Sequence, residues 1–229
     1  MGLRQLKKER TRQLIAETAW RLFAERGFDR VTVAEVAREA EVAEATVFNY
    51  FPAKEDLFFF RLEAFGARLV EAISTRPAGE PALVAFRRYL LTPAGLLGQL
   101  EAGDPEALER LRTVHRMIAA SPALQAREQR ALAGYADSLA ELLAAETGAP
   151  ADDVRARVAA NALMGVQRTL IDYVRRRVLA DDKPGRLAAD VRSLGKRALA
   201  LLANGLGDYA AKPAGRRQRK GAAPSSEDG

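Results

Sequence analysis

The segment from Thr32 to Phe58 constrains the fold of this chain more than any other. Thr32 and Glu35 have the spacing of a capping box at the start of a helix. The apolar residues that follow occupy the i, i+3, i+4 and i+7 positions of one helix face: Val33, Val36, Ala37 and Ala40. A second short helix continues the buried side with Val47 after a tight turn, so the segment predicts a helix-turn-helix.

The second helix of this pair carries short polar and aromatic side chains opposite its buried side. They are Glu44, Ala45, Thr46, Asn49 and Tyr50. Such side chains suit the DNA major groove, where base edges and phosphates offer hydrogen-bond donors and acceptors. The segment is therefore a candidate for reading DNA.

The segment resembles the DNA-binding domain of the TetR family of transcriptional regulators. The shared motifs come in a fixed order: Gly27-Phe28, Thr32-Val33, the run TVFNYF at 46–51 and the run PAKEDLF at 52–58. The resemblance implies an all-α protein with an N-terminal three-helix DNA-binding domain, containing the helix-turn-helix, and a larger helical ligand-binding and dimerisation domain. Beyond about Ile73 only a compatible pattern remains.

Two residues depart from the family pattern. Glu41 stands at a turn position where the family usually has glycine, and Ala43 stands where a Ser or Thr would cap the recognition helix. A side chain disfavours left-handed backbone, and alanine cannot accept a capping hydrogen bond. We expect each change to cost about 1 kcal/mol of stability.

Basic residues gather at both ends of the chain. The net charge is +6 and the isoelectric point is about 9.8, which favours a polyanionic partner. The helix-turn-helix itself is nearly neutral, so this attraction would come from the ends. We expect a disordered basic arm at 1–8 and a disordered basic tail at 211–229, and disorder is compatible with DNA contact.

Composition excludes several classes of site. The chain has no cysteine and one histidine, so disulfides, thiolate metal sites and paired-histidine mechanisms are excluded. No apolar run reaches the roughly 20 residues of a membrane span, and no signal peptide is recognisable. We expect a cytoplasmic protein without metal or cofactor that is not an enzyme.

Glycine and proline divide the remainder into helices. The helices predicted outside the helix-turn-helix cover 9–26, 54–73, 81–91, 105–120, 122–147, 150–177 and 184–209, and 92–103 is ambiguous. No strand pattern is present. The expected domains are the DNA-binding unit at 9–52 and the ligand-binding and dimerisation unit at 53–210.

The resemblance assigns phosphate contacts to four residues. Lys54 would hold a phosphate at the start of the fourth helix, and Thr46 and Tyr50 would donate hydroxyl hydrogen bonds. Thr32 could do the same or act only as a helix cap. Tyr50 could instead belong to the core, where we place Phe51.

Three residues would face the groove floor. Asn49 can pair with adenine, Ala45 can touch a thymine methyl group, and Glu44 can accept from cytosine N4. Because one helix reads too few bases, a homodimer that binds a palindromic operator in double-stranded DNA is expected.

The last two helices are the expected dimer surface, and the resemblance favours a four-helix bundle across the two-fold axis. These faces could also complete the core of the monomer. Their apolar residues are Val154, Val158, Ala162, Val166 and Ile171 on the first helix, and Leu187, Val191, Leu194, Ala198, Leu201 and Leu202 on the second.

The resemblance also implies a pocket for an unknown small-molecule effector. Candidate lining residues, each of which could be ordinary core, are Phe86, Tyr89, Leu90, Leu97, Val114, His115, Ile118, Tyr135, Leu139, Met164, Gln167, Arg168 and Ile171. Arg168 would favour an acidic ligand if it is buried, but it could equally lie on the surface.

The function expected from these features is a ligand-responsive repressor that a small molecule releases from its operator. Two alternatives belong to other classes: a sequence-tolerant architectural DNA-binding protein, and an all-helical enzyme. Nothing in the sequence resembles a catalytic constellation.

Overall fold

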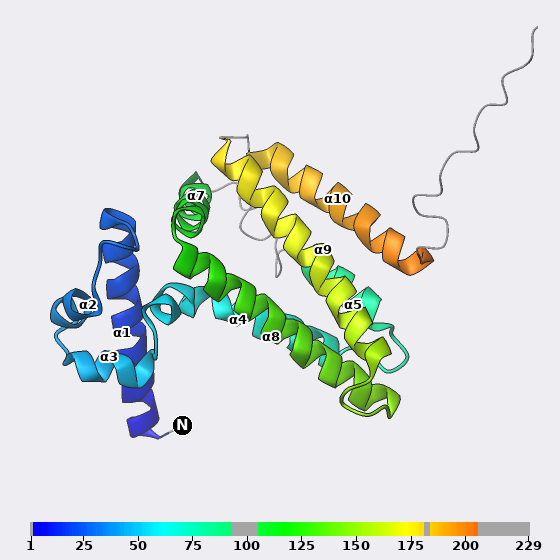
Figure 1. Ribbon diagram of the computed structural model, residues 1–229, viewed down its shortest axis with the longest axis horizontal. Helices are drawn as coiled ribbons and strands as arrows, with labels where there is room; N and C mark the ends of the chain where they lie inside the picture. The colour runs from blue at the N-terminus through cyan, green and yellow to red at the C-terminus, as the bar shows by residue number, and fades with distance from the viewer. Residues whose placement is uncertain (1, 93–104, 181–183, 206–229) are drawn as a thin grey trace, which may run out of the picture.

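The described residues of this chain are all helical or in short connections. The computed structural model describes residues 2–92, 105–180 and 184–205, within which no strand occurs. This confirms the predicted all-α class. The helices are α1 (Leu3–Arg26), α2 (Val33–Glu39), α3 (Glu44–Tyr50), α4 (Lys54–Ser74), α5 (Ala82–Leu90), α7 (Pro105–Ala120), α8 (Pro122–Thr147), α9 (Val154–Leu179) and α10 (Pro184–Asn204) (Figure 1).

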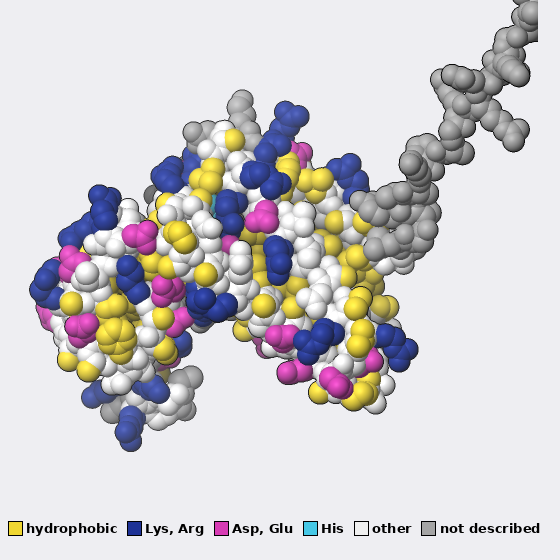
Figure 2. Space-filling model, in the orientation of Figure 1, with side chains coloured by type: hydrophobic (Ala, Val, Ile, Leu, Met, Phe, Trp, Pro, Cys, Tyr) yellow, Lys and Arg dark blue, Asp and Glu magenta, His cyan; other side chains and the backbone are white. Residues whose placement is uncertain are grey.

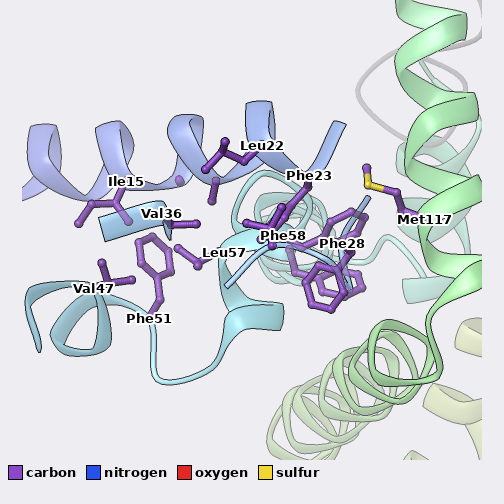
Figure 3. Close-up of a cluster of buried hydrophobic side chains, with 14 of the residues drawn as sticks. Ile15, Leu22, Phe23, Phe28, Val36, Val47, Phe51, Leu57, Phe58 and Met117 are labelled. Atoms are coloured by element: carbon purple, nitrogen blue, oxygen red, sulfur yellow. The ribbon is translucent and has the colours of Figure 1, made fainter. Parts of the chain in front are cut away.

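The first core lies between α1 and α4 and holds the helix-turn-helix in place. α1 ends at Gly27, whose φ of 85° suits glycine and whose N–H bonds to the carbonyl of Phe23. The rings of Phe23, Phe28 and Phe58 pack on one another, with centroids 5.0–6.4 Å apart (Figure 3). Val47 adds the buried side of α3 to this core.

The start of α2 has the predicted capping box. The side chain of Thr32 accepts from the N–H of Glu35, and the Glu35 carboxylate accepts from the N–H of Thr32 at 2.8 Å. These bonds satisfy two N–H groups that a helix end leaves unpaired. The hydrogen bonds from the Thr32 backbone and then from its hydroxyl lower the pKa of Glu35, because they favour the charged carboxylate.

The turn between α2 and α3 has both expected departures. Glu41 has a φ of 55° and is the one non-glycine residue of the described chain with a positive φ. Ala43 caps α3 without any side-chain hydrogen bond. The turn is therefore left-handed even though its residue carries a Cβ.

The first core extends beyond the predicted boundary at 52/53. Leu57, Phe58 and Phe59 at the start of α4 belong to it, as do Met117 of α7 and Leu124 of α8. Pro52 separates α3 from α4 along the chain, but the apolar face of α4 still packs against α1. α4 thus contributes to both this core and the second one, and the domain boundary at 52/53 stays a prediction.

A second core fills the other half of the molecule, among α4, α5, α8, α9 and α10. Gly66 permits close approach there, because a Cβ at this position would lie 2.0 Å from the Tyr135 ring. A third cluster between α7, α9 and α10 includes Val174, Leu187 and Val191.

The chain ends differ from the expected arrangement. α1 begins at Leu3, so residues 3–8 form the first turns of a helix and are not the separate arm that their charge predicted. The physical reason is that Leu, Gln, Lys, Glu and Arg all have high helix propensity. The predicted tail at 211–229 and the pocket candidate Leu97 lie outside the described residues.

A helix that crosses a membrane must be both long enough and apolar enough to span the bilayer. None of the described helices combines the length and the apolarity that crossing a membrane requires.

The positive φ of Glu41 leads to a stability prediction. Glu41→Gly should raise the free energy of unfolding by about 0.5–1 kcal/mol, because glycine relieves left-handed strain but increases the entropy of the unfolded chain. Urea denaturation measures this change. The control Glu41→Ala removes the same charge and keeps a Cβ, so it should give no gain. Equal gains from both variants would contradict a backbone origin.

Candidate nucleic-acid interface

The outward face of α3 is exposed and carries both polar and apolar side chains. Val47 is fully buried, which turns the opposite side of α3 to solvent. Glu44, Ala45 and Asn49, the three residues predicted to face bases, are all exposed, and Ala45 and Asn49 lie on the side opposite Val47. The structure therefore brings this part of the predicted site together.

Phe48 shares this face and was missed by the sequence analysis. Its side chain is 46% exposed, although large apolar side chains are usually buried. It lies three residues after Ala45, so both are on one side of the helix. The available signal was its position one residue after the buried Val47, which turns its side chain about 100° away from that of Val47.

The residues predicted to contact phosphate are partly buried or already hydrogen-bonded within the subunit. Thr46 is half-buried, and the Tyr50 ring packs partly against the first core. The Thr32 hydroxyl both accepts from the Glu35 N–H and donates to the Glu35 carboxylate at 2.9 Å. Thr32 thus acts as a helix cap on an exposed corner, and its phosphate contact stays a prediction.

Lys54 has a structural role that its sequence position did not reveal. Its ammonium donates to the carbonyls of Phe28 and Val31, both at 2.9 Å, and lies 4.2 Å from the centroid of the Phe28 ring. Burial lowers the pKa of this amine. Because an ammonium has three N–H groups, one remains for another acceptor, and the phosphate contact stays a prediction.

The predicted effector residues divide between two places. Val114 and Ile118 pack with the first core, on the side of the helix-turn-helix. A larger group shares the second core: Phe86, Tyr89, Leu90, Tyr135, Leu139, Met164 and Ile171. These seven remain candidates for lining a pocket.

Gln167 and Arg168 of α9 differ in burial. Gln167 is buried at 1% exposure, and no group among the described residues donates a hydrogen bond to its Oε1 atom. Arg168 is exposed, which is the surface position that the sequence had left open beside an interior one. Adjacent helical residues are about 100° apart, and this rotation carries Arg168 from the buried side of α9 to its exposed side.

His115 is buried at the junction of α7, α8 and α9. Its Nδ1 accepts from Arg175 Nε at 3.4 Å, and Arg175 also binds both carboxylate oxygens of Glu128 at 2.6 and 2.7 Å. Burial, and then the nearby Arg175 charge, lower the pKa of His115 to about 4. The imidazole is therefore neutral near pH 7 and already holds a partner.

The expected dimer residues also divide. Leu187 and Val191 are fully buried within the subunit, whereas Val154 and Val158 of α9 are 71% and 62% exposed. Figure 2 shows apolar side chains along α9 and α10 at the surface. An open hollow of about 550 Å³ lies beside them, and its lining is Ala82, Leu83, Leu143, Thr147, Asp153, Arg155, Ala156, Ala159, Ala162, Leu163 and Leu202.

Comparison with known proteins assigns the chain to a family. Residues 15–59 match the model of the bacterial regulatory proteins of the tetR family, and residues 94–207 match the model of the MftR C-terminal domain. The HTH-type transcriptional regulator TcmR of Streptomyces glaucescens is 30% identical over 154 residues, which span 66% of this chain and 67% of TcmR.

Solved structures show the same fold. The crystal structure of NalD, the secondary repressor of the MexAB-OprM multidrug efflux pump in Pseudomonas aeruginosa, has a TM-score of 0.53 at 22% identity, over 84% of this chain and 96% of NalD. The SmeT–triclosan complex has a TM-score of 0.51 at 18% identity, over 84% and 90% of the two chains. With the helix-turn-helix, its exposed α3 and the family models in agreement, this chain belongs to the TetR family of transcriptional regulators.

Proposed function

We propose that this chain is a ligand-responsive repressor that binds a palindromic operator as a homodimer in the cytoplasm and leaves it when a small molecule binds. The observation that carries the proposal is the outward face of α3. It is exposed, carries both polar and apolar side chains, and is backed by a buried core that fixes its orientation. A recognition helix needs these three properties.

The chemistry of that face suits base recognition. The Asn49 amide can donate to and accept from adenine, and the Glu44 carboxylate can accept from cytosine N4. Ala45 and Phe48 offer an apolar surface for thymine methyl groups. Their exposure supports this role. The apolar surface of Phe48 is now in water, so covering it in a groove would contribute favourable free energy to binding.

A second copy of the chain is the proposed occupant of the α9–α10 surface. Val154, Val158 and Leu201 are exposed apolar side chains on these two helices, and the open hollow continues the same surface. Apolar side chains grouped in this way favour association. A two-fold interface here would present two α3 helices at a fixed spacing, as a palindrome requires.

The second core is the proposed site of the effector. An amide oxygen without a partner costs about 1–3 kcal/mol when buried, so the Oε1 atom of Gln167 favours a ligand with an N–H or O–H donor. The fold shared with the SmeT–triclosan complex supports a small-molecule effector, as that complex holds one. A ligand that binds better to one spacing of the two heads shifts the population toward that spacing and releases the operator.

Selection of bound duplexes from a random pool tests the function. A palindromic consensus should emerge and be preferred over random duplex by at least about 1000-fold. Asn49→Ala should change the preferred base at its position, because an amide–adenine pair contributes about 1–3 kcal/mol of discrimination. Equal affinity for selected and random duplexes would instead support the sequence-tolerant architectural class.

Lys54→Met separates the two roles of Lys54. Because both bonded carbonyls lose their donor, the free energy of unfolding should fall by about 1–3 kcal/mol. Affinity for selected and random duplexes should fall together if the remaining N–H meets a phosphate. Urea denaturation and fluorescence anisotropy measure the two effects. An unchanged urea midpoint would refute the structural role, and unchanged affinity would remove Lys54 from the phosphate contacts.

Val158→Arg tests the dimer surface. An arginine at this position would bury an unpaired charge in each subunit, so the dissociation constant of the dimer should rise at least about 100-fold. Analytical ultracentrifugation across a concentration series measures this constant. The control Ala133→Arg places the same charge on an exposed position of α8, and its dimer should be unaffected. A Val158→Arg dimer as stable as the original would place the interface elsewhere.

A further inference from the structure

The first two turns of α1 carry three exposed cations that do not pack in the core. Arg4, Lys7 and Lys8 are exposed, and the helix that holds them begins at Leu3. The first fully buried residue of α1 is Ile15. The N-terminal part of α1 therefore projects beyond the core that the rest of the helix helps to form.

These cations continue the buried side of the helix. Residues three and four positions apart share a face, and such steps lead from Ile15 back to Arg12, Lys8 and Arg4. Lys7 lies beside this line. Glu9 lies on the flank of this line opposite Lys7, about 100° from Lys8, and Arg10 lies on the far side of the helix, about 160° from Lys8.

The contacts of Arg12 show that this face of α1 is directed toward the end of α3. The Arg12 guanidinium lies 5.6 Å from the centroid of the Phe51 ring, at the exit of α3, and 4.7 Å from that of Phe60. In Figure 1 the N-terminal end of α1 lies at the same end of the domain as α3 and far from α7. Each step of four residues adds about 6 Å along a helix, so Lys8 and Arg4 lie about 6 and 12 Å beyond Arg12.

The charge pattern is unfavourable for an isolated helix. Like charges at i, i+3 and i, i+4 repel, by about 0.2–0.5 kcal/mol a pair, and Arg4 faces both Lys7 and Lys8 in this way. The only acid of the segment, Glu9, is on the flank opposite Lys7. A polyanion along this face would remove the repulsion.

We propose that Arg4, Lys7 and Lys8 form a rigid helical row, here called the α1 row, that binds the DNA phosphates flanking the groove entered by α3. The proposal rests on the DNA-binding function proposed above. The α1 row widens the contact without reading bases, because phosphate contacts position a protein and carry no direct sequence information.

The salt dependence of binding tests the α1 row. For each phosphate neutralised, the slope of log association constant against log salt concentration changes by about 0.9. Lys8→Gln in the full-length chain should therefore flatten the slope by about two for a dimer on a random-sequence duplex. Arg10→Gln removes the same charge from the other side of the helix, and its slope should not change. Equal flattening by both variants would overturn the proposal.

A second pair of variants tests the helical arrangement. Glu9→Pro makes the segment more basic but breaks the helix before residue 9, so it should flatten the slope by an amount similar to or larger than that of Lys8→Gln. Glu9→Ala makes the same charge change and keeps the helix, so its slope should be at least as steep as that of the original chain. A steep slope in Glu9→Pro would identify a flexible basic tail and refute a fixed row.

Different results would refute the operator-binding function and the α1 row. A chain that prefers no selected palindrome would refute the operator-binding function, yet its affinity for random duplex would still report on the α1 row. A chain that prefers its palindrome, with slopes unaffected by Lys8→Gln, would refute the α1 row alone.

Discussion

The recognition surface of this protein depends on the burial of one side chain of α3 and of the residue directly after it. A helix of seven residues has too few hydrogen bonds to be stable by itself in water. Val47 and the following Phe51 anchor it, at 0% and 2% exposure, in a core built by α1, α2 and α4. Since these anchors fix the orientation of α3 about its own axis, they also decide which side chains meet DNA.

The same core connects the DNA-binding head to the remainder of the subunit. Ser121, at the corner of α7 and α8, donates to Asp29 at 2.9 Å, and Arg127 of α8 bonds to Asp56 at 2.8 Å. Asp56 also accepts from the N–H of Ala53 at the start of α4. The corner thus contacts the chain on both sides of the helix-turn-helix. The next residue of α8, Glu128, pairs with Arg175 of α9, so adjacent residues of α8 bond to the head and to α9.

Local features were predictable from the sequence, whereas features that depend on distant partners were not. The capping box and the end of α1 at Gly27 each follow from a few neighbouring residues. Lys54 shows the limit, because the carbonyls that hold its ammonium are more than 20 residues earlier in the chain.

The candidate effector site shows the same limit. Helical spacing alone indicated that α9 has an apolar side, but could not decide whether Gln167 or Arg168 faced the interior. Val114 and Ile118 likewise have the periodicity of core residues, and only the packing of the helices assigns them to the head side of the molecule. The residues beyond 205 and the segment 93–104 lie outside the described chain, so the predictions made for them stay predictions.

The division of α9 between Gln167 and Val158 has an evolutionary consequence under the proposed function. One side of the helix would line the effector site while the other would join the subunits, so a substitution that swells or tilts it would alter both properties together. New ligand preferences should therefore arise more readily through α5 and α8, whose changes leave the assembly intact. Among homologues, α9 should diverge slowly and in concert with its counterpart across the symmetry axis.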